Sequence, residues 1–343
     1  MNQVYVYPGA KQLREIELLK TPRMVLNTPL LRYFPFEGVR AWWLQWKQRD
    51  MYGGMTQIRS LNGRPPRVHP VGERDFLMRP GVYGEHMLID EMEMTLRTAQ
   101  ARPDQPVDVN NLVTQRQDQL LVRRFNRIEW LLWQLVVYGH FIVLDARGVI
   151  AHRDAYSIQT FTSSVPYSTH GTSTPMADFQ NVALYGRGTG TDFGRRATAF
   201  CNRVTGYHIN GNTNPADLGG RKINGGNNIT TINDVNGIFL GNDLPQIEIY
   251  DETYLDELGN QVPYIPDGKI VVMGALLNGE THGNFRFVIN QNNPGGEPAP
   301  YMKVIDRTAT QVPPEIEVHD GWNGGPVIYY PGSIVTMDVG PFA

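Results

Sequence analysis

A long extended segment that leads into one long basic helix constrains this chain more than any other feature. The extended segment covers residues 38–90 and carries Trp42, Trp43 and Trp46 near its base. A lone β-hairpin is only marginally stable in water, because it buries too little apolar surface. The segment therefore needs another surface to pack on, and we expect that surface to belong to a second copy of the same protein.

The tip of this extended loop is rich in proline and arginine. Its arginines are Arg59, Arg64 and Arg67. We expect the return run, residues 76–89, to pair antiparallel with the first strand, and the prolines to mark the turn, where no ladder hydrogen bonds are needed. The arginines suit contact with an acidic patch on a neighbour; a solvated loop is the alternative.

The clearest helical periodicity lies in residues 111–138. Apolar residues recur at steps of four and three, on one face of a helix: Leu121, Phe125, Ile128, Leu132 and Leu135. The arginines lie mostly off that stripe: Arg116, Arg123, Arg124 and Arg127. At 1.5 Å per residue the helix would be ~40 Å long, enough to span a whole domain. Gly139 is the expected C-terminal cap.

The remainder alternates between helical and strand-like patterns. Residues 140–154 predict a hairpin, and residues 210–236, rich in glycine and asparagine, predict a long loop. Further helices are expected at 175–185 and 192–204, and further strands at 246–254, 269–274 and 334–339. The chain thus belongs to the α+β class.

Composition excludes several classes of protein. With 343 residues, 41% hydrophobic and 19% charged, the chain is a globular protein of one elaborate or two ordinary domains. A net charge of −3 argues against a dedicated nucleic-acid binder. The 25 arginines against 6 lysines suit protein interfaces, although a GC-rich genome would produce the same bias.

The cysteine count and the apolar segments indicate the cellular compartment and whether the chain contacts a membrane. Cys201 is the single cysteine, so the chain has no disulfide framework and no cysteine-based metal site, and a reducing compartment is expected. The N-terminal residues lack the apolar region of a signal peptide. The most apolar window, residues 130–144, is too short to cross a bilayer, so we expect no membrane contact.

Motifs of catalysis are weak throughout. Gly186, Gly188 and Gly190 resemble a phosphate loop loosely, but no G-K-[ST] follows, and a turn is the better interpretation. The eight histidines do not form a zinc-site spacing. Glu315 and Glu317 would share one strand face, where solvent exposure explains them. We expect no catalytic residue, no cofactor and no metal.

Taken in order, the elements resemble those of the lambda-like major capsid proteins of tailed bacteriophages, whose fold also forms the capsid floor of herpesviruses. Three blocks carry the resemblance: residues 33–46, 76–89 and 245–275. No single motif decides it; the order of the blocks over nearly the whole chain does.

The resemblance implies the tailed-phage capsid fold, divided into an N-terminal arm, an extended β-hairpin loop, a peripheral domain that holds the long spine helix, and an axial domain at the centre of pentamers and hexamers. On this chain these would be 1–37, 38–90, 91–164 together with 276–343, and 165–275. The glycine- and asparagine-rich loop would then lie near the capsomer axis.

The implied function is a major capsid protein that self-assembles into an icosahedral phage head around double-stranded DNA, which it contacts non-specifically. Assembly would take place in the host cytoplasm. The expected intersubunit contact residues are Trp42, Trp43, Trp46, Arg59, Arg64, Arg67, Arg123 and Arg127. The rival interpretations are another phage structural protein, such as a tail or adhesive component, and a β-rich carbohydrate-active enzyme that uses Glu315, Glu317 or Asp251.

Further partners follow from the same resemblance: a portal, a scaffolding protein and, as one option, a decorating protein. Prolines between residues 1 and 37 leave little room for the long helices of a fused scaffold, so we expect a separate scaffold. Some relatives form lysine–asparagine crosslinks through a lysine near the loop tip. Here Lys47 is the lysine within residues 38–90 and lies near the base, so we expect a shell without such crosslinks.

Overall fold

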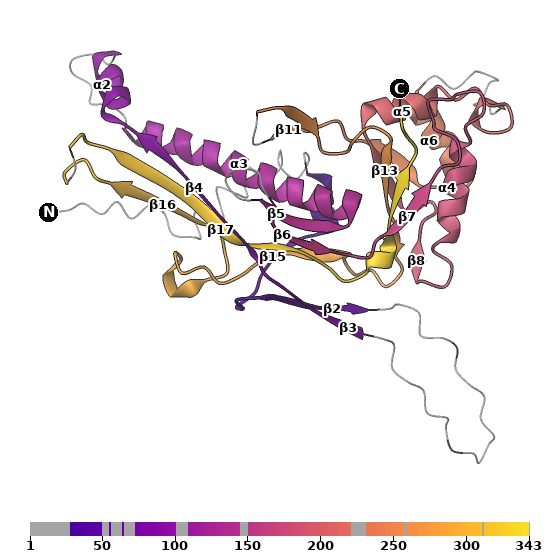
Figure 1. Ribbon diagram of the computed structural model, residues 1–343, viewed down its shortest axis with the longest axis horizontal. Coiled ribbons are helices and arrows are strands. Elements are labelled where there is room, and N and C mark those ends of the chain that lie inside the picture. The colour runs from indigo at the N-terminus through magenta and orange to yellow at the C-terminus, as the bar shows by residue number, and fades with distance from the viewer. Residues whose placement is uncertain are drawn as a thin grey trace. The chain divides into compact units, whose positions relative to one another are not determined.

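The computed structural model of the protein describes residues 28–49, 55, 64, 73–100, 109–144, 150–220, 231–256, 259–310 and 312–342 (Figure 1). The chain forms two compact units, and it passes from one to the other several times. Unit 1 takes Met1–Leu44, Met78–Glu129 and Phe285–Pro326, and unit 2 takes Gln45–Leu77, Trp130–Asn284 and Val327–Ala343.

Unit 1 is built on a five-stranded mixed sheet. Its strands are β1 (Phe36–Gly38), β15 (Gly283–Phe287), β17 (Ile316–Ile328), β16 (Tyr301–Asp306) and β4 (Gly81–Ile89). β1 runs parallel to β15, whereas β16 and β4 both pair antiparallel with β17. The long strand β17 is therefore the centre of this sheet.

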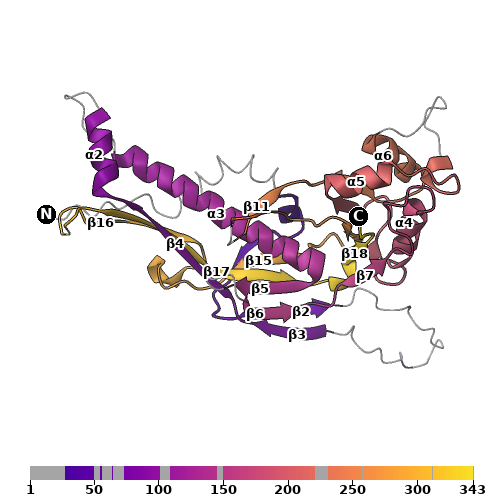
Figure 2. The ribbon, with the colours of Figure 1, turned by 45° about the horizontal axis from the view of Figure 1, so that its top comes forward.

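Helices α2 (Glu91–Gln100) and α3 (Val109–Tyr138) follow β4 in the chain. The first turns of α3 pack on the sheet of unit 1, beside β4 and β17 (Figure 2). That packing buries Ile89, Leu112, Val113, Leu120, Ile316 and Val318 in one cluster. Buried and half-buried residues alternate over residues 316–320 of β17, as expected for a strand with one face on a core, whereas the rest of the strand is buried apart from Asn323.

The long helix is confirmed almost to the residue, because α3 spans Val109–Tyr138. Leu121, Ile128, Leu132 and Leu135 of the predicted stripe are buried. Gly139 ends the helix with φ +67°, and its N–H donates to the Leu135 carbonyl at 2.9 Å. A side chain is strained in that left-handed conformation, which is why glycine is favoured there.

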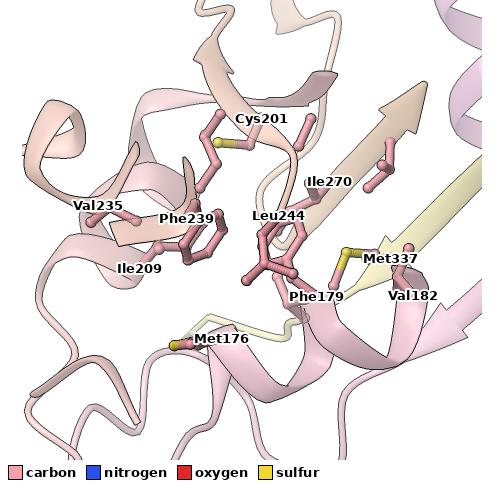
Figure 3. Close-up of a cluster of buried hydrophobic side chains, with 14 of the residues drawn as sticks. Met176, Phe179, Val182, Cys201, Ile209, Val235, Phe239, Leu244, Ile270 and Met337 are labelled. Atoms are coloured by element: carbon pink, nitrogen blue, oxygen red, sulfur yellow. The ribbon is translucent and has the colours of Figure 1, made fainter. Parts of the chain in front are cut away.

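Unit 2 has a five-stranded sheet of its own, in the order β10 (Gln246–Ile249), β9 (Thr198–Cys201), β13 (Lys269–Met273), β18 (Ile334–Asp338) and β7 (Gln159–Thr162). Helices α4 (Pro175–Leu184), α5 (Arg203–Asn210) and α6 (Ile232–Gly241) belong to this unit. Their apolar faces and the sheet enclose a core that includes Phe179, Cys201, Phe239, Ile270 and Met337 (Figure 3).

Several two-stranded pairs complete the described chain. They are β2 (Leu44–Arg49) with β3 (Glu73–Met78), β5 (His140–Leu144) with β6 (Ile150–Ala155), β8 (Thr191–Asp192) with β14 (Ala275–Leu276), and β11 (Thr253–Leu255) with β12 (Gln261–Pro263). The predicted hairpin at 140–154 is confirmed as the antiparallel pair β5–β6. Short 3₁₀ helices occur at Pro29–Arg32, Leu218–Gly220, Pro294–Gly296 and Pro331–Ser333.

The predicted helix over residues 192–204 is wrong. This stretch holds the end of β8, the buried strand β9 and the start of α5. Burial favours a strand over a helix here, since Ala199, Phe200 and Cys201 are all fully buried between two neighbouring strands of the sheet. Asn202 then starts α5 by accepting a hydrogen bond from the Thr205 N–H at 2.8 Å, a side-chain cap within the stretch predicted as helix.

The predicted loop over residues 210–236 is too long at its C-terminal end. Helix α6 starts at Ile232, because Thr231 and Asp234 form a reciprocal capping box that satisfies the first backbone N–H groups. Residues 211–220 are organised by buried polar side chains: Asn212, Asn214 and Asp217. Residues 221–230 of the predicted loop lie outside the described residues.

The expected return strand over residues 76–89 is also corrected. It is two strands, β3 and β4, separated by Arg79 and Pro80. Proline lacks the N–H that a ladder needs, so it interrupts the pairing. β3 pairs with β2 as expected, but β4 pairs with β17 in the sheet of unit 1. Within the described part of the chain, no helix is both long and apolar enough to cross a membrane.

Candidate intersubunit surface

The three tryptophans near the loop base lie in different environments. Trp46 is 5% exposed, and its ring stacks on Phe76 of β3 at 5.5 Å and packs against Tyr156 at 5.9 Å between centroids. Trp46 therefore fixes β2 to its own unit and leaves little surface for a neighbour. Trp42 and Trp43, in contrast, are 57% and 39% exposed.

An arginine from the other end of the loop covers one of these exposed rings. The Arg79 guanidinium carbon lies 5.5 Å from the centre of the Trp43 ring, within the range of a cation–π contact. The contact joins the two ends of the loop in unit 1, one just before β2 and the other just after β3. It leaves Trp42 as the more exposed of the pair.

The loop itself is described only at its root. Lys47 of β2 and Glu73 of β3 form an ion pair at 2.9 Å across the two strands, and both side chains are about half exposed. Arg64 is exposed, whereas Arg59 and Arg67 of the predicted tip lie outside the described residues. The described contacts at the root of the loop thus include the packing of Trp46 and the Lys47–Glu73 ion pair.

Arg123 on α3 binds a carboxylate of its own chain. Its Nε and Nη2 donate to the two oxygens of Glu85 on β4 at 2.5 and 2.8 Å. This fork-to-carboxylate geometry gives two parallel charge-assisted hydrogen bonds. The hydrogen bond from Arg123 is the main reason why the pKa of Glu85 is lowered, and the charge of Arg127 adds to it. Arg123 is 59% exposed in its side chain, so its outer surface remains accessible.

Arg127 lies one turn further along α3 and is half-buried. Its charge acts on Glu85 and on Tyr83 of β4, whose pKa is raised by burial. The Tyr83 ring stacks on Trp322 of β17 at 4.1 Å between centroids. Both predicted helix arginines therefore lie at the edge where α3 meets β4.

Sequence reasoning missed a third arginine on the same helix. Arg124 is buried, and its Nη1 lies 3.6 Å from Oδ1 of Asp320 on β17. The helical spacing indicated the burial of Arg124, because it is three residues after Leu121 and four before Ile128 and so lies on the apolar stripe. It was not predicted to be buried because a charged side chain is usually exposed.

Two of the three candidate catalytic carboxylates, Glu317 and Asp251, lie in ion pairs. Glu317 accepts from His319 Nε2 at 2.6 Å and pairs with Arg307 at 3.1 Å. The hydrogen bond from His319 is the main cause that lowers the pKa of Glu317. Asp251 pairs with Arg203 at 3.1 Å. These are the contacts of structural carboxylates on strands and loops.

Other motifs also have structural explanations. The glycine run at 186–190 forms turns, with Gly188 and Gly190 at positive φ, as predicted. Cys201 is fully buried, and burial raises the pKa of its thiol to about 12, which opposes formation of a reactive thiolate. Among the described residues, no group of three histidine, cysteine, aspartate or glutamate side chains could hold a metal ion.

Solved structures share this fold. A prophage protein of Escherichia coli CFT073, described as its capsid protein, is 16% identical, with a TM-score of 0.54 over 78% of this chain and 80% of its own. A phage-related protein of Bordetella bronchiseptica RB50 is 11% identical, with a TM-score of 0.53 over 93% and 94%. The capsid of an empty GTA particle is 8% identical, with a TM-score of 0.52 over 92% and 90%.

No curated protein sequence matches this chain significantly. A family model does match: that of phage major capsid protein E, over residues 14–285. The match covers well over half of the chain, and the similar structures have the same fold. The chain belongs to the phage major capsid protein E family, and it is a subunit of a phage capsid shell.

Proposed function

We propose that this protein assembles as pentamers and hexamers into the icosahedral head of a phage, around double-stranded DNA, and that it performs no catalysis. The proposed mechanism is geometric. The loop between β2 and β3 extends onto a neighbouring subunit, and the exposed tryptophans at its base are covered in the shell. A portal, a scaffolding protein and a decorating protein are the further partners that this role implies.

One observation carries the proposal: Trp42 is 57% exposed beside the root of a long loop. Large aromatic side chains are enriched at protein interfaces and depleted from freely exposed surface. Phe36, which is 43% exposed, lies shortly before Trp42 and Trp43 in the chain. Covering such side chains with a second subunit removes apolar surface from water, at roughly 25 cal/mol per Å².

The capsid domains remain part of the proposal. We assign the N-terminal arm to 1–37, the extended loop to 38–90, the peripheral domain to 91–164 and 276–343, and the axial domain to 165–275. The sheet of unit 2 supports an axial domain, because β9, β10 and β13 all lie within 165–275. Its strand β18 comes from the second peripheral segment, so chain from outside 165–275 completes that sheet.

The intersubunit contacts are tested by removing them one at a time. Deletion of residues 60–72 and the double change Trp42→Ala with Trp43→Ala should both leave a folded subunit that fails to form stable shells. The matched control is Leu255→Ala, which shortens another large apolar side chain that is 72% exposed, in the hairpin β11–β12. Assembly is scored by sedimentation and negative-stain microscopy, and folding by circular dichroism.

The outcomes separate the possibilities. Shells of normal yield and stability from the deletion and from the double tryptophan variant would contradict the proposed contacts. Loss of shells with Leu255→Ala alone would place the interface on unit 2 instead. A tail component, the rival function, would give tubes or small rings rather than closed shells when the unaltered chain is assembled with its phage partners.

A further inference from the structure

Two histidines of unit 2 share one hydrogen bond between their rings. His170 lies in the segment before α4, and His208 lies on α5. His170 Nε2 and His208 Nδ1 are 3.0 Å apart, and the ring centroids are separated by 5.2 Å. The ring of Phe342, in the residues that follow β18, packs on His208 at 4.3 Å between centroids. An aromatic side chain therefore covers one side of the pair.

This pair lies where residues 211–220 begin. Gly211 ends α5, and a Cβ at that position would approach His170 Cε1 to 3.1 Å, closer than ordinary contact. The N–H of Thr213 donates to the His170 carbonyl at 2.9 Å. His170 therefore holds residues 211–213 with its backbone, while its ring is held by His208.

The charge state of the two rings decides whether their bond exists. A neutral imidazole has one N–H and one acceptor nitrogen, whereas a protonated ring has two donors and no acceptor. With both rings neutral, one N–H donates to the other ring's lone pair. One added proton leaves an acceptor in place. Two added protons put hydrogen on both facing nitrogens and bring two positive charges together.

The surroundings oppose charge on His208. Burial, and after it the neighbouring His170, lower the pKa of His208, whereas Asp267 acts to raise it. Among the described residues, Asp267 is the carboxylate whose charge acts on His208, and its Oδ1 already accepts a hydrogen bond from Asn202 at 2.5 Å. Tyr207 is a further titratable side chain beside the pair, with its ring centroid 6.2 Å from that of His170.

The sign of the pH effect follows from linkage. His208 has a folded pKa below the ordinary histidine value of about 6.5, so the unfolded chain binds this proton more readily. The stability that the pair contributes is therefore present above pH ~6.5 and is lost as the pH falls below it.

We propose that His170 and His208 form an acid-sensitive clasp between the segment before α4 and helix α5, whose ring-to-ring hydrogen bond breaks when both rings are protonated. The clasp rests on the geometry of unit 2 and holds whether or not the proposed intersubunit contacts are correct. It would make the contact between α5 and the segment before α4 respond to mild acid.

Hydrogen exchange of the full chain tests the clasp. Protection factors of peptides that cover residues 165–173 and 203–213 are compared at pH 7 and pH 5. Loss of one hydrogen bond corresponds to about a threefold to tenfold fall in protection, which we expect in the unaltered protein at pH 5. His170→Gln should abolish that fall, because its amide donates to neutral His208 and its carbonyl accepts from protonated His208.

The matched control is His86→Gln, the same substitution at an exposed histidine of unit 1, which should show the same fall in protection at pH 5 as the unaltered protein. The reciprocal variant His208→Gln should abolish that fall, and it replaces His170→Gln if the latter does not fold. An equal fall in the unaltered protein and in the clasp variants would overturn the proposal. Unchanged protection in the unaltered protein at pH 5 would overturn it as well.

Discussion

Arg124 on α3 and Asp320 on β17 form an ion pair in which the two side chains are 5% and 6% exposed, with Nη1 and Oδ1 3.6 Å apart. The guanidinium also lies over the ring of Phe125, at 5.9 Å from its centroid. Removing two charges from water is expensive, and each of these charges is tolerated in the core of unit 1 because the other is present. The pair thereby fixes how α3 packs on the central strand.

Breaking this pair from one side should be strongly destabilising. Asp320→Ala leaves the Arg124 charge buried without its carboxylate, and we expect a loss of ~3–5 kcal/mol in the free energy of unfolding, measured with urea on the unassembled chain. The double change Arg124→Met with Asp320→Leu removes both charges and should cost less than the single change. A single change that costs no more than the double one would contradict this account of the pair.

The two faces of α3 should respond in opposite ways to truncation. Leu132 is fully buried, so Leu132→Ala should cost ~2–5 kcal/mol of unfolding free energy. Arg123→Ala removes an ion pair with 59% and 49% exposed side chains, and exposed pairs contribute roughly 0–1 kcal/mol. Arg123→Ala should therefore leave folding intact and, under the proposed function, change the yield of shells. If Arg123→Ala unfolds the chain while Leu132→Ala is silent, the helix faces the other way.

We expect the buried side chain of His282 to lower the free energy of unfolding in acid. His282 is 4% exposed, and burial lowers its pKa to about 4 even though its Nε2–H donates to the Gly274 carbonyl at 2.7 Å. The unfolded chain binds this proton at an ordinary pKa of about 6.5, so unfolding becomes easier as the pH falls from ~6.5 to ~4, by up to ~3 kcal/mol.

The measurement is the slope of unfolding free energy against pH. Other groups titrate in the same range, so the informative quantity is the difference between the unaltered chain and His282→Gln, which has no such proton to bind. The glutamine variant should be less stable at pH 7 but should show a shallower slope between pH 6.5 and 4. Identical slopes would mean that His282 is not protonated on unfolding in this range.

The long helix was predictable because its signal is local. Residues 111–138 carry a repeating apolar stripe and end at a glycine, and both features act within a few turns of the same segment. The strands at 269–273 and 334–338 were predictable for a similar reason, since each is a short β-branched run between turn residues.

What could not be predicted depends on partners distant in the sequence. Arg124 lies on the apolar stripe, and only Asp320, supplied by a strand near the other end of the chain, makes its burial acceptable. β4 follows β3 after two residues, yet its partner is β17 rather than β2. The stretch at 192–204 has no strong strand pattern of its own, and the buried neighbours β10 and β13 determine that it forms β9. The intersubunit roles of the tryptophans and arginines stay predictions.

A long-range cap on α4 gives the last prediction. Thr174 occupies the N-cap position but makes no side-chain cap hydrogen bond. Asp217 takes over that task from a distant loop: its two carboxylate oxygens accept from the N–H groups of Met176 at 3.0 Å and Ala177 at 3.2 Å. A negative charge at a helix N-terminus is also favoured by the helix dipole.

Asp217→Ala should therefore cost ~1–3 kcal/mol of unfolding free energy, because it leaves buried N–H groups without an acceptor. Asp217→Asn keeps one acceptor oxygen and should cost less. It also removes a charge that contributes, after burial, to the raised pKa of Asp178 in the first turn of α4. The matched control is Thr174→Ala at the formal cap position, which should be nearly neutral. Equal costs for Thr174→Ala and Asp217→Ala would show that the helix start is held by the local residue, and that Asp217 does not pin residues 211–220 to α4.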